Sequence, residues 1–154
     1  MSGNVIQGVC FLPLRVVPTP RGDVLHVLRP GNPLLPDFRD GFGELYFSEV
    51  LPGCVKAWKR HTRQTQRFAV PVGRIGIALH DDRPLSSTRG ALQVRELGRP
   101  DAYGLLLIPP MVWYGFRALG PHPALICNCA DTPHDPAEGE RRPPDDPRIP
   151  YRFE

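Results

Sequence analysis

Short strand-like runs separated by turn residues constrain this chain more than any other feature. Helical periodicity is almost absent from the sequence, whereas strand-like runs are frequent. The chain also contains 20 Pro and 15 Gly, which interrupt helices and favour turns. The expected strands are residues 5–10, 24–28, 44–50, 54–60, 66–72, 74–80, 91–97, 105–108, 112–117 and 124–129. Short strands at this spacing predict an all-β sandwich or barrel with little helix.

The length of 154 residues predicts a single domain that spans residues 1–154 and is large enough to bury a core. Residues 131–154 differ in composition, because they are rich in Pro, Asp, Glu and Arg and poor in aliphatic residues. This segment nevertheless ends in Ile149, Tyr151 and Phe153. We therefore expect a Pro-rich tail that packs on the barrel through these apolar side chains.

Charge and cysteine content exclude several classes of function. The net charge is +3 and the basic residues are scattered, so we expect no nucleic-acid partner. No apolar run is long enough for a membrane helix, and the first residues lack the pattern of a signal peptide. The four cysteines have no zinc-site spacing and are typical of free thiols in a reducing compartment. These observations predict a cytoplasmic protein without a membrane partner.

Several polar residues extend the apolar faces of the expected strands. Gln66 continues the face of Phe68, and Tyr114 lies between apolar neighbours of the same parity. Lys59 and His61 share the parity of Val55 and Ala57 in the same way, and Asp81 follows Ile77 and Leu79. Convergent polar groups above an apolar floor are typical of the mouth of a small barrel that binds a ligand.

The same positions test whether the barrel holds a metal ion. Gly53, Lys59, His61, Gln66 and Gly73 resemble the first cupin motif, and residues 104–114 resemble the second. A metal cupin uses three His and one Glu, whereas the four slots here hold Lys59, His61, Gln66 and Tyr114. A lysine ammonium repels a cation and a neutral amide binds one weakly. We therefore expect a cupin jelly roll with no transition metal and no other cofactor.

Four stretches in order, residues 43–83, 105–120, 124–136 and 141–151, resemble the dTDP-4-dehydrorhamnose 3,5-epimerase family. The resemblance covers residues 40–152 and is strongest to short, divergent members. It implies a metal-independent enzyme that acts on a nucleotide-linked 4-keto-6-deoxy sugar. In that family a base removes the proton beside the ketone, and the enolate is reprotonated on its other face. A His oriented by an Asp is the base, and a Tyr delivers the proton.

The family's functional residues are only partly present. The position of the base His falls on Lys59, and that of a family lysine falls on Gln66. Asp81 and Arg83 match the Asp and Arg that close the following strand. The family's tyrosine in the strand that ends near Cys129 has no clear counterpart. The resemblance therefore implies an altered base and an altered acid.

The candidate catalytic residues are Lys59, His61 and Tyr114. Lys59 is either a base with a lowered pKa or a fixed charge for a phosphate or enolate, unless it is a surface lysine. His61 suits acid–base chemistry or a structural role, and Tyr114 is a proton donor or a core aromatic. The candidate substrate-binding residues are Arg60, Gln64, Gln66, Asp81, Arg83 and Trp113, although the parity of Trp113 also favours packing.

The first hypothesis for function is an isomerase resembling 4-keto-6-deoxy-sugar 3,5-epimerases, with a nucleotide sugar as its substrate. The alternatives are a catalytically altered cupin that binds a small ligand without epimerising it, and a sugar 3,4-ketoisomerase. We also expect a homodimer, because members of the family pair through their sheets. The strand expected at residues 43–50 is a plausible exchanged edge.

Overall fold

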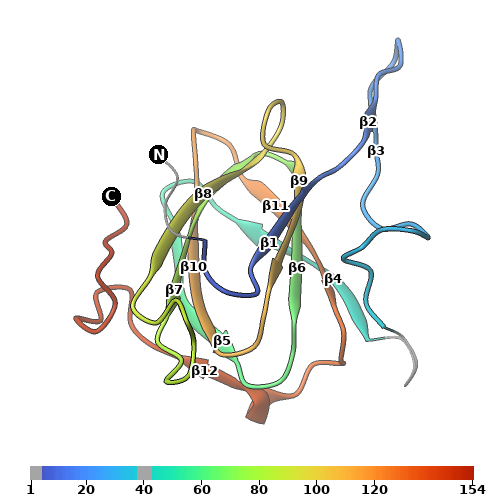
Figure 1. The fold of residues 1–154 in the computed structure, drawn as a ribbon. Helices are drawn as coiled ribbons and strands as arrows, with labels where there is room; N and C mark the ends of the chain where they lie inside the picture. The colour runs from blue at the N-terminus through green and yellow to red at the C-terminus, as the bar shows by residue number, and fades with distance from the viewer. Residues whose placement is uncertain (1–4, 38–42) are drawn as a thin grey trace.

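The computed structural model describes residues 5–37 and 43–154, so residues 40–42 of the family match lie outside it. Two five-stranded antiparallel sheets face each other (Figure 1). The first sheet has the order β1 (Cys10–Pro13), β9 (Gly104–Ile108), β6 (Gln66–Val72), β11 (Ala124–Ala130) and β4 (Glu44–Val50). The second has the order β12 (Gly139–Arg141), β5 (Val55–His61), β10 (Val112–Ala118), β7 (Arg74–Asp81) and β8 (Leu92–Gly98).

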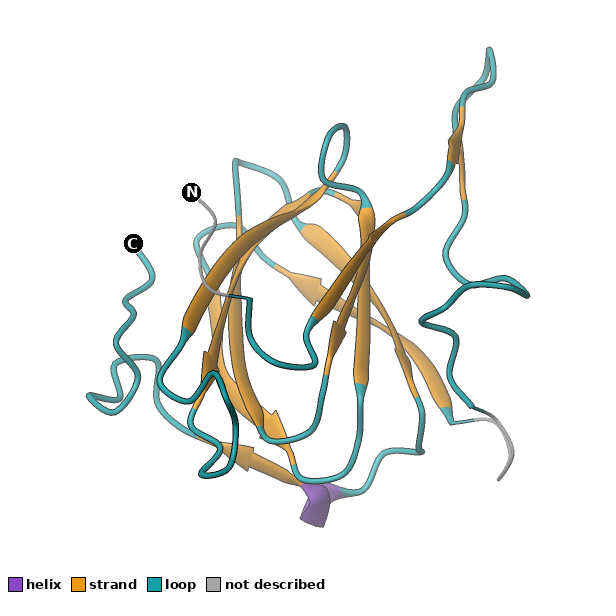
Figure 2. Ribbon diagram, viewed as in Figure 1, coloured by secondary structure: helices purple, strands orange, loops and turns teal. Residues whose placement is uncertain are grey.

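Strands dominate the structure, as Figure 2 shows, and the predicted all-β jelly roll is confirmed. The remaining elements are a small hairpin of β2 (Val16–Val17) and β3 (Val24–Leu25) and the 3₁₀ helix η1 (Pro136–Glu138). The strand expected at residues 5–10 is wrong, because the chain turns there and the amide of Val9 bonds to the carbonyl of Ile6. The strand β12 was not expected, since the sequence Gly-Glu-Arg has no alternating pattern.

The core lies between the two sheets and follows the predicted alternation. Ile75, Ile77 and Leu79 of β7 are fully buried against the inward residues of β6, β10 and β11. Val72 departs from the pattern and is 53% exposed. The reason is a register shift in the pairing of β6 with β11, which turns the end of β6 outward.

A β-bulge in β5 corrects part of the predicted face of that strand. Lys59 pairs with Tyr114, whereas Lys56 pairs with Phe116, so β5 has one more residue than β10 over this stretch. Lys59 and His61 point inward as predicted. Lys56 is exposed but also lines the cavity between the sheets, and Ala57 packs on the outer face. Gly115 permits this packing, because a Cβ there would lie 2.5 Å from the Cβ of Ala57.

The tail lies across the outer face of the second sheet. Ile149 is fully buried with Trp58 and Trp113. The rings of Tyr151 and Phe153 lie 6.2 and 5.3 Å from the ring of Trp58. Before it reaches this face, the tail forms β12, which pairs with the edge of β5.

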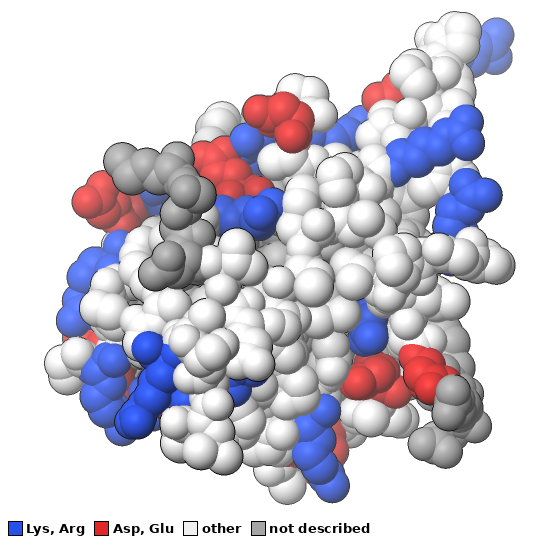
Figure 3. All heavy atoms as spheres, in the orientation of Figure 1, with Lys and Arg blue, Asp and Glu red and all other residues white. Residues whose placement is uncertain are grey.

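The surface is mixed in charge. Figure 3 shows basic and acidic side chains interspersed around one face of the molecule, with a broad uncharged area between them. The described residues of that face form no continuous basic stripe. No helix within residues 5–37 and 43–154 is long and apolar enough to cross a membrane.

A buried carboxylate closes one end of the barrel. Asp81 is fully buried and accepts hydrogen bonds from Arg83, Ser86 and Thr88, with the Nε of Arg83 at 2.8 Å. Arg83 also donates to the carbonyl of Gln7, which ties the N-terminal segment to this end. Burial by itself raises the pKa of Asp81, but the hydrogen bonds outweigh it and hold the pKa below its usual value of 3.8.

The replacement Asp81→Asn is expected to lower the free energy of unfolding by about 3 kcal/mol near neutral pH, because it leaves the buried Arg83 contact without its anion. The folded pKa is depressed, so this stabilisation is present above pH 3.8 and is lost as the pH falls through the folded pKa. Urea unfolding at neutral pH and at about pH 3 measures both effects. Asp101→Asn is the matched control, since Asp101 is an exposed partner of Arg74 and its loss should matter little. An equal loss in both variants would contradict the prediction.

Candidate functional site

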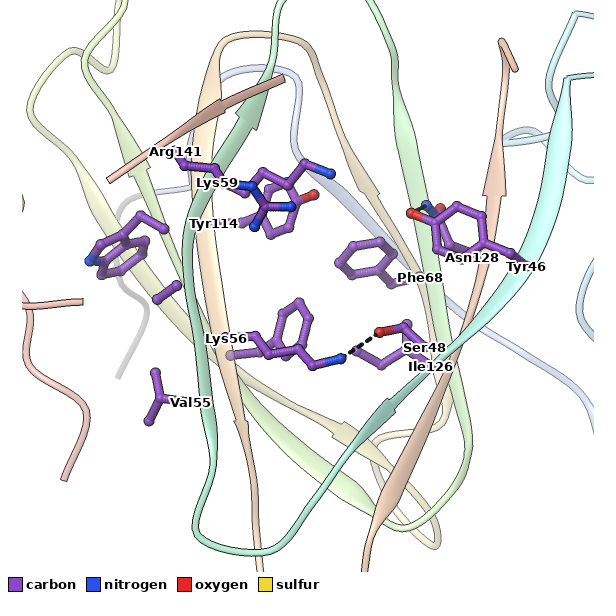
Figure 4. Close-up of a pocket in the computed structure, with 13 residues that line it drawn as sticks. Tyr46, Ser48, Val55, Lys56, Lys59, Phe68, Tyr114, Ile126, Asn128 and Arg141 are labelled. Atoms are coloured by element: carbon purple, nitrogen blue, oxygen red, sulfur yellow. Dashed lines mark hydrogen bonds between the residues drawn. The ribbon is translucent and has the colours of Figure 1, made fainter. Parts of the chain in front are cut away.

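A cavity of about 550 Å³ opens between the two sheets, and Figure 4 shows the side chains that line it. This volume lies within the usual range for small-molecule sites. Its floor is aromatic, because the ring of Phe68 meets those of Tyr114 and Phe116 edge-on at 5.5 and 6.0 Å. Ile126 of β11 completes the apolar part of the wall. A flat apolar group therefore finds packing partners at the base of the cavity.

Three cations line the cavity, namely Lys56, Lys59 and Arg141. Lys56 donates to the hydroxyl of Ser48 at 3.1 Å and to the carbonyl of Glu49 at 2.6 Å. Lys59 of β5 and Arg141 of β12 both line the cavity, and among the described residues neither side chain makes a hydrogen bond or an ion pair. Figure 4 shows them together on the wall that carries Tyr114. This wall therefore has positive charge available for an anionic ligand.

Lys59 is partly buried. Burial lowers the pKa of its ammonium group, the neighbouring Arg141 lowers the pKa further, and Glu138 opposes both effects. An unpaired cation in such a place is costly unless a ligand supplies negative charge. We therefore interpret Lys59 and Arg141 as ligand-binding groups of the cavity wall.

A hydrogen-bonded chain of three side chains begins behind this wall. Nδ1 of His61 lies 2.7 Å from Oε2 of Glu138, and Nε2 of His61 lies 3.0 Å from the hydroxyl of Tyr114. The other carboxylate oxygen of Glu138 accepts the backbone amides of Arg63 and Gln64 at 2.5 and 2.7 Å. All three members of the chain are at least nine-tenths buried. Their order resembles that of a carboxylate–imidazole–hydroxyl triad.

The backbone fixes the protonation pattern of this chain. Burial raises the pKa of Glu138, but the amides of Arg63 and Gln64 and the imidazole of His61 outweigh it, so the carboxylate is ionised. Burial lowers the pKa of His61, which keeps the ring neutral near pH 7. Glu138 must then accept from Nδ1–H, and Nε2 accepts the hydroxyl proton of Tyr114. The oxygen of Tyr114 consequently offers a lone pair to the cavity.

A second polar chain supports the opposite wall. Oδ1 of Asn128 accepts the backbone amide of Arg67 at 3.0 Å, and because that amide can only donate, the orientation of the Asn128 side chain is fixed. Its Nδ2 then donates to Oε1 of Gln66 at 2.5 Å and to the hydroxyl oxygen of Tyr46 at 2.9 Å. Gln66 in turn donates to Gln64 at 2.8 Å.

The structure brings together five of the predicted site residues. Lys59 and Tyr114 line the cavity directly, and His61 bonds to Tyr114 from behind. Gln64 and Gln66 are buried beside it and reach the cavity only through Asn128.

Arg60 and Trp113 lie on the outer face of the second sheet and not at the cavity. The guanidinium of Arg60 lies 4.6 Å from the ring of Trp113 and 2.8 Å from the carboxylate of Asp82. Trp113 also donates its indole N–H to Asp82 at 2.9 Å. Strand alternation is the reason, since each of these residues follows or precedes an inward neighbour. The structure therefore does not bring these two predicted substrate-binding residues to the cavity, and their contacts here are packing contacts.

Asp81 and Arg83 also lie away from the cavity. Both are engaged at the closed end of the barrel, where the carboxylate of Asp81 is fully satisfied by protein donors. The structure therefore does not bring these two predicted substrate-binding residues to the cavity.

Sequence reasoning missed several residues of the site, among them Lys56, Tyr46, Asn128, Glu138 and Arg141. Lys56 has the wrong parity for an inward residue unless the bulge is known. Tyr46 lies between the exposed residues Leu45 and Phe47 on β4. Strand alternation could therefore have predicted that the side chain of Tyr46 points inward. Glu138 and Arg141 lie in the Pro-rich tail, where no periodicity places them on a strand. Within residues 5–37 and 43–154, no group of three or more His, Cys, Asp or Glu side chains is placed to hold a metal ion.

Comparison with known proteins gives consistent relatives, although no family model matches the chain. The crystal structure of a dTDP sugar isomerase from Desulfovibrio desulfuricans G20 is 53% identical, with a TM-score of 0.90, over 95% of this chain and 90% of that one. The spore coat polysaccharide biosynthesis protein SpsL of Bacillus subtilis is 31% identical over 96% of this chain and 91% of its own length. The probable low-salt glycan biosynthesis epimerase Agl13 of Haloferax volcanii is 39% identical over 69% of this chain.

The match to the Haloferax protein spans 65% of that relative's length, whereas the other two matches cover nearly the whole of both chains. The fold, the sequence motifs and these relatives therefore indicate the same family. This chain belongs to the family of dTDP-sugar epimerases and isomerases that includes the dTDP-4-dehydrorhamnose 3,5-epimerases, as its sequence motifs predict.

Proposed function

We propose that this protein epimerises a nucleotide-linked 4-keto-6-deoxy sugar at a carbon next to the ketone. The observation that carries the proposal is the buried chain Glu138–His61–Tyr114, which ends at the cavity beside the cations Lys59 and Arg141. The substrate class is supported by the relative that is 53% identical and is a dTDP sugar isomerase. We place the reaction in the cytoplasm, where free cysteines such as those of this chain stay reduced.

The first step is removal of the proton beside the ketone. The oxygen of Tyr114 accepts this proton while its own hydroxyl proton passes to Nε2 of His61, and Glu138 stabilises the imidazolium that forms. The C–H electron pair becomes the C=C bond of an enolate, and the former ketone oxygen takes the negative charge. Burial raises the pKa of Tyr114, so the phenol stays neutral until His61 takes its proton.

Lys59 is assigned to charge stabilisation in this scheme. It is the cross-strand partner of Tyr114 and lies beside Arg141, so both cations can face the enolate oxygen. Fixed cations in a site that excludes water stabilise such developing charge strongly. Lys56, which is exposed at the mouth beside Ser48, suits a phosphate of the nucleotide.

The proposal is tested by incubating the protein with dTDP-linked 4-keto-6-deoxyhexoses in deuterated water. Solvent deuterium at C3 or C5, followed by inversion, is the expected result in the proton NMR spectrum. Migration of the ketone would instead identify a 3,4-ketoisomerase. Tight binding without exchange across such sugars would identify a catalytically altered cupin and would overturn the proposal.

Replacement of Lys59 separates its two possible roles. Lys59→Gln is expected to slow exchange by about 100-fold, because a fixed cation at the enolate is lost. Lys59→Arg keeps the charge and is expected to retain most of the activity, while Tyr114→Phe loses about 100-fold or more. Initial exchange rates measured under saturating substrate give the comparison. If Lys59→Arg is as inactive as Lys59→Gln, Lys59 is the base and its assignment here is wrong.

The rate should fall at low pH with a midpoint below 6.5, the usual pKa of histidine. Burial lowers the pKa of His61, and His61 must be neutral to accept the proton of Tyr114. Glu138→Gln removes an influence that raises this pKa, so it should shift the midpoint lower still and reduce the rate. The profile of kcat/KM against pH measures both effects. His122→Gln, in the exposed loop before β11, is the control, and a wild-type midpoint above 6.5 would argue against this role of His61.

We also propose a homodimer through the β4 edge of the first sheet. Within the described residues β4 pairs only with β11, and its outer face exposes Leu45, Phe47 and the following Leu51 at 46, 60 and 52%. An exposed apolar edge of this kind favours pairing with a second copy. The wild-type protein should sediment as a dimer and Phe47→Asp as a monomer. Val94→Asp, at an equally exposed position of β8, should remain dimeric, and a monomeric wild type would exclude this interface.

A further inference from the structure

Inversion of a carbon requires a second proton-transfer group opposite the first. Tyr114 and its relay occupy the wall formed by β5, β10 and β12. A proton returned from that wall restores the original configuration, so an epimerase needs a donor on the wall formed by β4, β6 and β11. Three cavity-lining groups on that wall carry N–H or O–H protons, namely Tyr46, Ser48 and Asn128. Ser48 lies beside Lys56, whereas Asn128 donates to the oxygen of Tyr46.

Tyr46 faces Tyr114 across the cavity. Tyr46 lies on β4 and is the register partner of Asn128 on β11. Figure 4 shows Tyr46 and Asn128 on one side of the cavity and Tyr114 with Lys59 on the other, with Phe68 between them. A sugar ring that stands on the aromatic floor would therefore present one face to each phenol.

The hydrogen bonds give the two phenols opposite polarity. Asn128 is fixed so that its Nδ2 donates to the oxygen of Tyr46, which leaves the hydroxyl proton of Tyr46 free for the cavity. Tyr114 instead donates its proton to His61 and leaves a lone pair for the cavity. One wall therefore accepts a proton while the other wall offers one.

We propose that Tyr46 is the proton donor that completes the inversion, an assignment that rests on the proposed function. In this step the Tyr46 O–H bond breaks, its proton bonds to the enolate carbon, and the C=O bond of the ketone is restored. Asn128 stabilises the phenolate of Tyr46 through Nδ2, and Gln66 holds the Asn128 amide in place. Amide donors of this kind are strongest toward a charged acceptor.

The cycle closes by proton exchange with water. After inversion the relay holds one extra proton on His61 and Tyr46 lacks one. A smaller cavity of about 210 Å³, lined by His61, Lys59 and His134, adjoins the relay and gives His61 a route to solvent. Tyr46 itself is only partly buried, so water can return its proton from the main cavity.

The test compares exchange with inversion in deuterated water for Tyr46→Phe. This variant should still exchange the proton next to the ketone, because Tyr114 and His61 are intact, but it should invert at least about 100-fold more slowly than wild type. Deuterium is then returned on the original face. Tyr114→Phe should lose exchange and inversion together, which distinguishes the two walls.

Tyr151→Phe is the matched control, because Tyr151 lies in the tail on the outer face and its ring contacts remain. It should exchange and invert as the wild type does, and circular dichroism checks the fold of each variant. Inversion at the wild-type rate by Tyr46→Phe would overturn the assignment, and so would equal loss of exchange and inversion. If the wild type neither exchanges nor inverts the sugars, the proposed function itself is wrong, and not only the assignment of Tyr46.

Discussion

The pairing of β12 with β5 is the interaction on which the site depends. Gly139 pairs with His61, and the tail continues with two backbone bonds between Arg142 and Trp58 at 2.8 and 3.0 Å. This pairing brings Arg141 to the cavity and Glu138 to His61. A Cβ at position 139 would lie 3.3 Å from Cε of Lys59, so the glycine lets the tail approach the strand closely. The tail therefore completes the wall to which we assign removal of the proton.

The outer face holds this strand in place. The ring of Trp113 lies 4.6 and 4.2 Å from the central guanidinium carbons of Arg60 and Arg142, and its indole N–H donates to Asp82. Cation–π contacts and charge-assisted bonds at a partly buried site are among the stronger polar interactions in proteins. Two residues that the sequence placed among the substrate-binding candidates thus stabilise the segment that carries Arg141.

Sequence reasoning predicted the features that arise from regular alternation and missed those that depend on irregular backbone. The buried stripe of Ile75, Ile77 and Leu79 and the inward direction of Lys59 and Tyr114 result from a period of two. The bulge that turns Lys56 inward has no sequence signature in this chain, because the register of β5 is set by its pairing with β10. The position of Glu138 could not be predicted either, because nothing in the sequence of a Pro-rich tail indicates which strand it will lie beside.

If Tyr46 is the proton donor, as we propose, then it stands in for the tyrosine that β11 lacks. Asn128 occupies the inward position of β11, and its direct cross-strand partner on β4 is Tyr46. Side chains paired in this way lie close together on one face, so a phenol on either strand can reach the same part of the cavity. Asn128 then takes a new role, because its amide fixes which atom of Tyr46 faces the ligand. The backbone amide of Arg67 fixes the orientation of the Asn128 amide. A main-chain donor in β6 therefore determines that Tyr46, the proposed proton donor, accepts a hydrogen bond from Asn128 and keeps its own hydroxyl proton available.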